Sequence, residues 1–166
     1  KKETISKNEV NQAIDRIIGG IAGTPLEDGK NKGFCIVSLP DEGLVAIHDA
    51  VRPLPSMEII RMSFDTAALH GGSIPVVQLK DSIRKISVLN SVALNRADYL
   101  SVQTPQSFDL SLIKPAYSVN YSHAFTDDAS VFEAAGHRVQ HFPGCPINIK
   151  VTTPEDLIIA SALLEP

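Results

Sequence analysis

Residues 43–79 read GLVAIHDAVRPLPSMEIIRMSFDTAALHGGSIPVVQL, and this stretch decides the fold class. Its two ends, 43–49 and 73–79, are apolar runs rich in β-branched residues, which is the pattern of strands buried on both faces. Between them, Ser56 is placed to cap a helix whose apolar residues recur at spacings of three and four. The Gly-Gly pair at 71–72 then ends that helix. Strand, helix and strand in this order predict an α/β sheet with crossover helices.

The rest of the chain continues the alternation of short apolar runs and helical patterns. Residues 81–96 alternate polar and apolar side chains, which predicts a hairpin. Thr153, followed by proline and then by Asp156, predicts a capped helix start near the C-terminus. We expect further strands at 33–39, 137–142 and 147–151, a polar loop at 19–33, and helices at 8–18, 109–117, 127–136 and 152–164.

Length and composition set the class of protein. The 166 residues are enough for one domain with a real core, and 43% hydrophobic with 20% charged residues is typical of a folded, water-soluble chain. A net charge of −4 argues against nucleic acid as the main partner. No apolar stretch approaches the roughly 18 residues that span a bilayer, so we expect no membrane partner and a cytoplasmic location. Cys35 and Cys145 fit neither a metal spacing nor a disulfide framework.

Polar side chains follow the expected strand at 43–49. Ligands of open α/β sheets bind beyond the carboxyl ends of the strands, and Asp49 and Arg52 lie there. Arg52 offers a planar guanidinium suited to a phosphate, and Asp49 offers a hydrogen-bond acceptor. A structural alternative is equally open at this point: Asp49 caps the next turn, Arg52 pairs with it, and Pro53 ends the strand.

Six short motifs extend this reading to most of the chain. They are HDAVRP (48–53), DSI (81–83), NR (95–96), QTPQSF (103–108), TDDAS (126–130) and NIKVTTPEDL (148–157). In this order and spacing, the chain from about Gly43 to its C-terminus resembles the 2-C-methyl-D-erythritol 4-phosphate cytidylyltransferases. The resemblance implies a three-layer, Rossmann-like nucleotide-diphosphosugar transferase fold with a mainly parallel sheet. It also implies CTP and methylerythritol phosphate as substrates, Mg²⁺ bound mainly through the CTP phosphates, and an isoprenoid precursor as product.

The same resemblance implies a homodimer in which an arm of about residues 80–101 crosses to the partner subunit. Carried over residue by residue, it makes Lys150 and Arg96 catalytic: Lys150 contacts the reacting phosphates, and Arg96 reaches the partner's substrate phosphate. Asn95 stands before Arg96 where the family usually has an acidic residue. The substrate-binding residues that it implies are Asp49, Arg52, Ser82 (where the family usually has threonine), Thr104 and Thr126.

Cations and hydroxyls suit this chemistry because two polyanions must meet when the sugar-phosphate oxygen attacks the α-phosphorus of CTP. Structural alternatives remain open for several of these residues. Lys150 could be a solvent-facing strand lysine, Thr126 a helix cap, and Thr104 a turn residue before proline. His48 is expected to be structural, because this reaction needs no proton abstraction.

One feature of the family is missing from the sequence. Its members begin with a strand and a glycine-rich loop that holds the CTP triphosphate, and no such segment occurs here. We expect residues 1–166 to be one incomplete cytidylyltransferase domain, the alternative being a divergent homologue that does not bind CTP normally. Two other functions stay open: a ribitol-5-phosphate cytidylyltransferase, and a non-catalytic dimeric binding homologue. Thr126 and Ser130 favour methylerythritol over ribitol.

Overall fold

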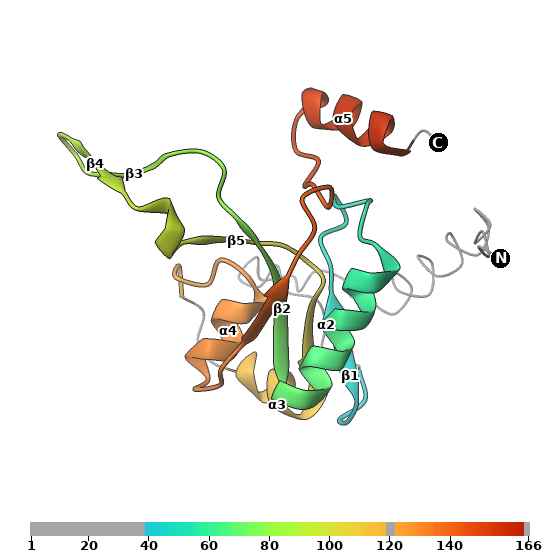
Figure 1. The fold of residues 1–166 in the computed structure, drawn as a ribbon. Helices are drawn as coiled ribbons and strands as arrows, with labels where there is room; N and C mark the ends of the chain where they lie inside the picture. Colours follow the sequence, from blue (N-terminus) through green and yellow to red (C-terminus); the bar gives the residue numbers. More distant parts are fainter. Residues whose placement is uncertain (1–38, 119–121, 165–166) are drawn as a thin grey trace, which may run out of the picture.

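A computed structural model describes residues 39–118 and 122–164 of this chain, as a sheet flanked by helices with a hairpin that projects from it (Figure 1). Two sheets are present in this part of the chain, one of five strands and one of two. The elements are, in order, β1 (Leu44–Ile47), α2 (Met57–His70), β2 (Gly72–Gln78), β3 (Ile83–Ile86), β4 (Ser91–Leu94), the 3-10 helix η2 (Arg96–Asp98), β5 (Leu100–Val102), β6 (Gln106–Asp109), α3 (Leu110–Ala116), α4 (Asp128–Ala134), β7 (Gln140–Pro143) and α5 (Pro154–Leu164).

The five-stranded sheet combines two strand directions. Its order is β1-β6-β2-β5, with β7 on the other side of β2. Strands β1, β2 and β7 run the same way, because β1 and β2 each pair antiparallel with β6 and β7 pairs parallel with β2. The reversed track is made by β5 and β6, which pair with successive parts of β2. The α/β class is therefore confirmed. Strands β1, β2 and β7 are parallel in direction, but β5 and β6 run the opposite way and lie beside them, so most of the hydrogen-bonded pairs are antiparallel.

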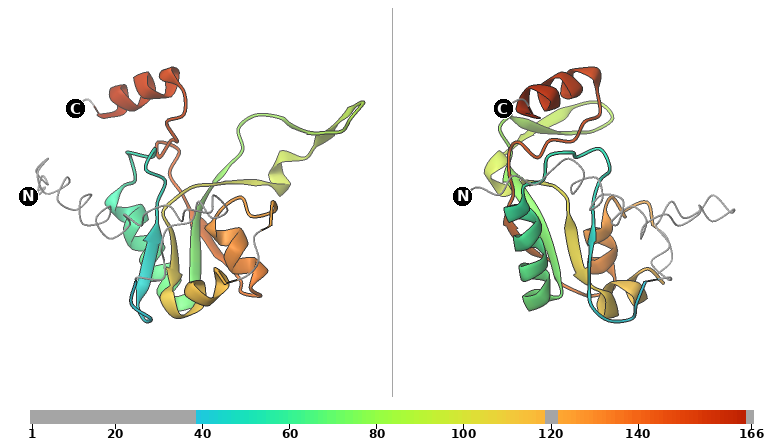
Figure 2. Two further views of the ribbon diagram at one scale, coloured as in Figure 1. Left: turned by 180° about the vertical axis from the view of Figure 1, so that it is seen from behind. Right: turned by 90° about the vertical axis from the view of Figure 1, so that its right-hand side faces the viewer.

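Helices cover both faces of this sheet, as the views in Figure 2 show. Helix α2 packs on one face and buries Ile59, Ser63 and Ala67. Helices α3 and α4 pack on the other face, where the rings of Phe108 and Phe132 are fully buried with centroids 5.0 Å apart. Fully burying a side chain of this kind stabilises the fold by roughly 2–3 kcal/mol. The three-layer arrangement predicted from the sequence is thus confirmed for the described residues.

Local signals located several helix ends correctly. The Ser56 hydroxyl accepts from the N–H of Ile59, and Gly71 has the left-handed backbone (φ 84°) that ends α2. Thr153 and Asp156 bond each other's backbone N–H groups at the start of α5, as expected for a capping box. At α4 the prediction was wrong by one residue, because the cap is Asp127 and not Thr126.

The segment at 147–151 corrects a second prediction. It was expected to be a strand, but no strand is assigned there. The backbone of this segment bonds to side chains and to an isolated carbonyl rather than to a neighbouring strand: Val151 N–H donates to the Val51 carbonyl (2.8 Å), and the Asn148 carbonyl accepts from Arg52. The expected elements at 8–18 and 19–33, and most of the one at 33–39, lie outside the described residues.

The predicted hairpin is present. Strands β3 and β4 pair antiparallel from Ile83↔Leu94 to Ile86↔Ser91 and extend well beyond the sheet (Figure 1). Helix α5 also stands apart from the sheet, with Ala160 as its buried residue. In the described part of the chain no helix has both the length and the apolar character needed to cross a membrane.

Candidate functional site

The site forms where β1 ends and β6 begins. Ile47, the last residue of β1, pairs with Gln106, the first residue of β6. The residues just outside this pair are therefore neighbours although they are far apart in the sequence. The N–H of Asp49 donates to the Thr104 hydroxyl at 3.0 Å. Strand pairing thus brings two of the predicted substrate-binding residues into contact.

Two cations meet at one carboxylate in this site. Oδ2 of Asp49 lies 3.1 Å from Nε of Arg52 and 3.3 Å from Nζ of Lys150. The Arg52 side chain is largely buried (11% exposed), whereas that of Lys150 is 48% exposed. The group carries a net charge of +1, with one cation fixed in place and the other open to solvent. Such an arrangement can bind a phosphate.

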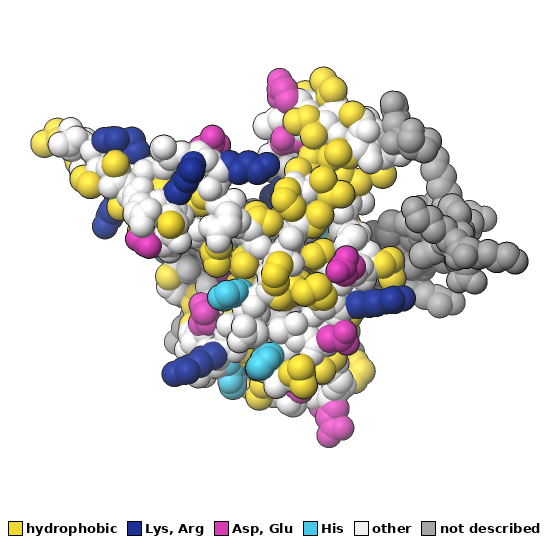
Figure 3. All heavy atoms as spheres, in the orientation of Figure 1, with side chains coloured by type: hydrophobic (Ala, Val, Ile, Leu, Met, Phe, Trp, Pro, Cys, Tyr) yellow, Lys and Arg dark blue, Asp and Glu magenta, His cyan; other side chains and the backbone are white. Residues whose placement is uncertain are grey.

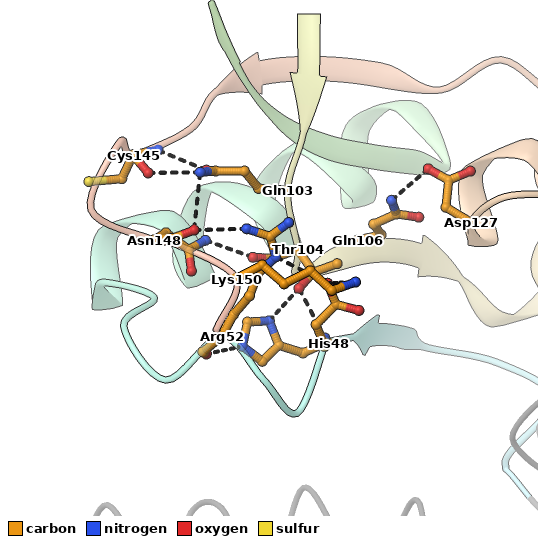
Figure 4. A network of polar contacts seen from close by, with 10 residues as sticks. His48, Arg52, Gln103, Thr104, Gln106, Asp127, Cys145, Asn148 and Lys150 are labelled. Carbon is orange, nitrogen blue, oxygen red and sulfur yellow. Dashed lines mark hydrogen bonds and ion pairs between the residues drawn. The ribbon is translucent and has the colours of Figure 1, made fainter. Parts of the chain in front are cut away.

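The structural alternative for Asp49 and Arg52 is confirmed, because the two side chains pair and the backbone turns between them; their role in substrate binding stays a prediction. The Arg52 N–H donates to the Asp49 carbonyl at 3.0 Å, which is the turn that the structural alternative predicted. Lys150 also joins the pair, and Figure 4 shows its side chain beside Arg52 and Thr104. The alternative of a solvent-facing strand lysine is wrong about the strand, because Lys150 lies outside any strand and contacts Asp49, although its side chain is half exposed.

The His48 ring links Arg52 to Thr104 in the same group. One ring nitrogen, Nε2, lies 2.8 Å from the Arg52 carbonyl, and the other, Nδ1, lies 2.9 Å from the Thr104 hydroxyl (Figure 4). A carbonyl only accepts, so Nε2 carries a proton and donates to it, and Nδ1 shares a hydrogen bond with the Thr104 hydroxyl. These contacts agree with the structural role expected for His48.

The backbone around Lys150 is held by two side-chain amides. Nδ2 of Asn148 donates to the Thr104 carbonyl at 2.8 Å, and Nη1 of Arg52 donates to the Asn148 carbonyl at 2.9 Å. Gln103 donates to the same Asn148 carbonyl at 3.2 Å. Asn148 and Gln103 are both buried. Lys150 is therefore attached to the site through backbone contacts as well as through its own ammonium group.

The N-terminus of α4 is tied to the same edge of the sheet. Gln106 donates to Oδ2 of Asp127 and accepts from the N–H of Ala129, both at 2.9 Å. The Thr126 N–H donates to the Ser130 hydroxyl at 3.1 Å. This places Thr126 in the loop that leads into α4, where its own N–H belongs to the cap network.

Asp128, the first residue of α4, and its partner Tyr117 both have shifted pKa values. Burial raises the pKa of its carboxyl above the ordinary value, and the negative charges of Asp127 and Asp49 raise it further, whereas a hydrogen bond from the Tyr117 hydroxyl opposes this. Burial, together with the charge of Asp128, also raises the pKa of Tyr117 above its ordinary value.

Two of the predicted residues lie elsewhere. Ser82 and Arg96 belong to the projecting hairpin and are exposed, and the Arg96 guanidinium donates to the Lys80 carbonyl. Figure 1 shows that this hairpin points away from the end of β1. Within one chain the structure therefore brings together Asp49, Arg52, Thr104 and Lys150, with Thr126 at the same edge, and leaves Ser82 and Arg96 apart.

Sequence reasoning missed the groups that hold the site in shape: Gln103, Gln106 and Asn148. Each stands inside a motif that the sequence analysis singled out, directly beside or two residues from a predicted site residue. That position was the available signal, because amides can donate and accept at once and so suit the bracing of irregular backbone. Nothing in the spacing indicated which backbone segment they hold.

The fold and the group at Asp49 define an α/β domain that carries two cationic side chains beyond the end of a strand, which is where open α/β sheets bind their ligands. The sequence profile of one family, 2-C-methyl-D-erythritol 4-phosphate cytidylyltransferase, matches residues 6–166. The chain belongs to this family.

Individual relatives agree with the profile. The 2-C-methyl-D-erythritol 4-phosphate cytidylyltransferase of Bacteroides thetaiotaomicron is 41% identical over 152 residues, which cover 92% of this chain and 68% of the relative. That of Bacteroides fragilis is 47% identical over 122 residues, which cover 74% of this chain and 56% of the relative. The chain thus spans between about half and about two thirds of the length of these curated relatives.

Solved structures agree as well. A 4-diphosphocytidyl-2C-methyl-D-erythritol synthase from Anaerococcus prevotii is 27% identical, with a TM-score of 0.71 over 98% of this chain and 80% of that one. The 2-C-methyl-D-erythritol 4-phosphate cytidylyltransferase from Thermus thermophilus is 29% identical, with a TM-score of 0.64 over 72% of this chain and 61% of that one.

Proposed function

We propose that this chain forms the substrate-side part of an enzyme that transfers a cytidylyl group from CTP to 2-C-methyl-D-erythritol 4-phosphate. The products are the cytidine-diphospho derivative and pyrophosphate, in the pathway to isoprenoid precursors. The observation that carries the proposal is the meeting of Arg52 and Lys150 at the carboxylate of Asp49, within contact of Thr104. Family membership supports the choice of substrates.

The geometry suits phosphoryl transfer by positioning and charge. In the reaction, a phosphate oxygen of the sugar phosphate attacks the α-phosphorus of CTP, the bond to the bridging oxygen breaks, and pyrophosphate leaves with that electron pair. Two polyanions repel each other, so the barrier falls when fixed cations surround the reacting phosphates. Lys150 is the exposed cation that can contact them, and Arg52 is the fixed one. Asp49 holds both cations next to each other through its carboxylate.

Mg²⁺ is the cofactor that we propose, carried mainly by the triphosphate. Among the described residues no group of three or more His, Cys, Asp or Glu side chains could hold a metal ion. Mg²⁺ commonly keeps several waters and binds one or two carboxylates together with substrate phosphates. A site with a single carboxylate therefore fits an ion that arrives with CTP. Asp49 is the carboxylate of the group that can supply a protein oxygen. When bound, the ion neutralises charge on the triphosphate.

We further propose a cytoplasmic homodimer in which the hairpin of one subunit completes the site of the other. The apolar side chains at the hairpin tip support this: Val88 and Leu89 are 100% and 96% exposed, and Ile86 is also largely exposed. Figure 3 shows hydrophobic side chains at the end of the projection, with Lys and Arg side chains along its length. An apolar tip of this kind favours burial in a partner. Arg96 would then reach the partner's substrate phosphate.

The test is a pyrophosphate-release assay of the complete gene product with CTP, Mg²⁺ and either methylerythritol phosphate or ribitol 5-phosphate. We expect release with the first acceptor and little with the second. Preferential release with ribitol 5-phosphate would favour the related ribitol enzyme. No release with either acceptor would favour the non-catalytic homologue and would refute the proposal.

A further inference from the structure

Gln103 is almost completely buried (5% exposed) at the point where β5 ends and the chain turns toward β6. Its backbone N–H donates to the Pro75 carbonyl of β2 at 2.8 Å, so its main chain belongs to the sheet. Its side chain leaves the sheet and points to the loop after β7 (Figure 4). A rigid strand thus presents one amide to an irregular loop.

All three side-chain hydrogen bonds of Gln103 go to the backbone of that loop. Nε2 donates to the carbonyls of Cys145 (2.9 Å) and Asn148 (3.2 Å), and Oε1 accepts from the Cys145 N–H (3.1 Å). Gly144 allows this approach, because a Cβ at that position would lie 2.5 Å from Oε1 of Gln103. The loop conformation is therefore matched to an amide that donates and accepts at once.

The loop held by Gln103 leads directly to Lys150. The Asn148 carbonyl accepts from both Gln103 and Arg52, so one backbone oxygen links the amide to the fixed cation of the site. Two residues further on, Nζ of Lys150 lies 3.3 Å from Asp49. The position of the loop relative to the sheet thus sets where Lys150 stands relative to Arg52.

We propose that Gln103 is a positioning residue: its amide holds the loop at 144–148 in the conformation that places Lys150 beside Asp49 and Arg52. This deepens the proposed function and rests on it for its catalytic consequence. The structural part, the clamp itself, stands on the three hydrogen bonds alone.

Two substitutions separate the roles of the amide. Gln103→Met keeps the length of the side chain and removes all three bonds. Gln103→Glu keeps an acceptor for the Cys145 N–H but turns a second oxygen toward two carbonyl oxygens, which repel it. The matched control is Gln140→Met, because Gln140 is exposed on β7 and its amide donates to the adjacent His141 carbonyl.

The first measurement does not depend on activity. In a Cys35→Ser background Cys145 is the remaining thiol of residues 1–166, and its rate of reaction with a disulfide reagent, followed by mass spectrometry of the labelled peptide, reports opening of the loop. We expect Gln103→Met to react at least about fivefold faster than the parent, and Gln140→Met to react within about twofold of it. For Gln103→Glu, the excess over the parent should shrink as the pH is lowered and the carboxyl gains a donor proton. Equal rates in all variants would overturn the clamp.

The second measurement asks whether Gln103 acts through Lys150. Gln103→Met should lower kcat by about 10- to 100-fold with a smaller change in KM, since a displaced cation loses contact in the transition state. In a Lys150→Ala background the same change should cost less than about threefold. An equal loss in both backgrounds would show that Gln103 does not act through Lys150 and would overturn the positioning role. If the parent releases no pyrophosphate, the proposed function fails, and the thiol rates still decide the clamp.

Discussion

Replacing Lys150 with methionine should remove activity while leaving stability almost unchanged. The Lys150 side chain is 48% exposed and lies 3.3 Å from Asp49. An ion pair this exposed contributes no more than about 1 kcal/mol to folding, and Asp49 keeps Arg52 as a partner at 3.1 Å after the change. A preorganised charge at reacting phosphates is worth about 3 kcal/mol in the transition state, which corresponds to roughly a hundredfold in rate.

The matched control is Lys114→Met, which removes a better-buried lysine of α3 that bonds the segment before β1 instead of Asp49, Arg52 or Thr104. The Lys114 side chain is 18% exposed, and its ammonium donates to the Leu39 carbonyl and to Asp41, both at 2.7 Å. Losing the charged bond to the Leu39 carbonyl should cost about 1–2 kcal/mol of unfolding free energy. The rate of pyrophosphate release should stay within about twofold of the parent at a temperature where both are folded.

Comparing the two variants separates a loss of rate from a loss of stability. Urea unfolding followed by circular dichroism gives the stability of each, and steady-state pyrophosphate release gives kcat and KM. We expect opposite patterns, with rate lost in Lys150→Met and stability lost in Lys114→Met. A Lys150→Met enzyme that is unstable but fast when folded would refute the assignment of Lys150 to the reaction.

The hairpin, the buried carboxyl and the core each give a further prediction. Arg96→Ala should abolish turnover without dissociating the dimer, and mixing it with Lys150→Ala subunits should restore part of the activity; unrestored mixtures that contain heterodimers would count against a shared site. Because the raised pKa of Asp128 lets the folded state hold a proton that the unfolded state has lost, stability should fall as pH rises through the folded pKa. Asp128→Asn should therefore lose less unfolding free energy between about pH 4 and about pH 7, as measured by urea titration, and an unchanged slope would contradict this. Gly72→Ala should destabilise the fold by about 1–3 kcal/mol in the same titration, because its Cβ would lie 2.7 Å from a fully buried phenylalanine ring, whereas an unchanged midpoint would mean that the ring moves freely.

The sequence predicted the elements whose signals are local. Ser56 and Gly71 mark the ends of α2 because a cap acts on backbone groups within one turn, and these are neighbours in the chain as well as in space. The error at α4 had a local cause too. Thr126, Asp127 and Asp128 are adjacent and each could cap the helix, and in the structure the cap is Asp127, which forms a capping box with Ser130. The error at 147–151 had a distant cause. Apolar residues alternate there as in a strand, but the segment is bonded to residues 103 and 104 through side-chain amides instead of pairing with a strand.

The residue types that handle phosphate, and the motifs that contain them, could be recognised from the amino-acid order alone. Their convergence could not. Asp49 meets Thr104 because Ile47 pairs with Gln106, and strand register is decided by contacts between residues distant in the chain. Lys150 meets Asp49 because the Gln103 amide bonds the Asn148 carbonyl and the Asn148 amide bonds the Thr104 carbonyl, and those bonds exist only once the sheet is assembled. Residue identity thus determined the chemistry that this protein can offer, and only the tertiary structure decided which groups act together.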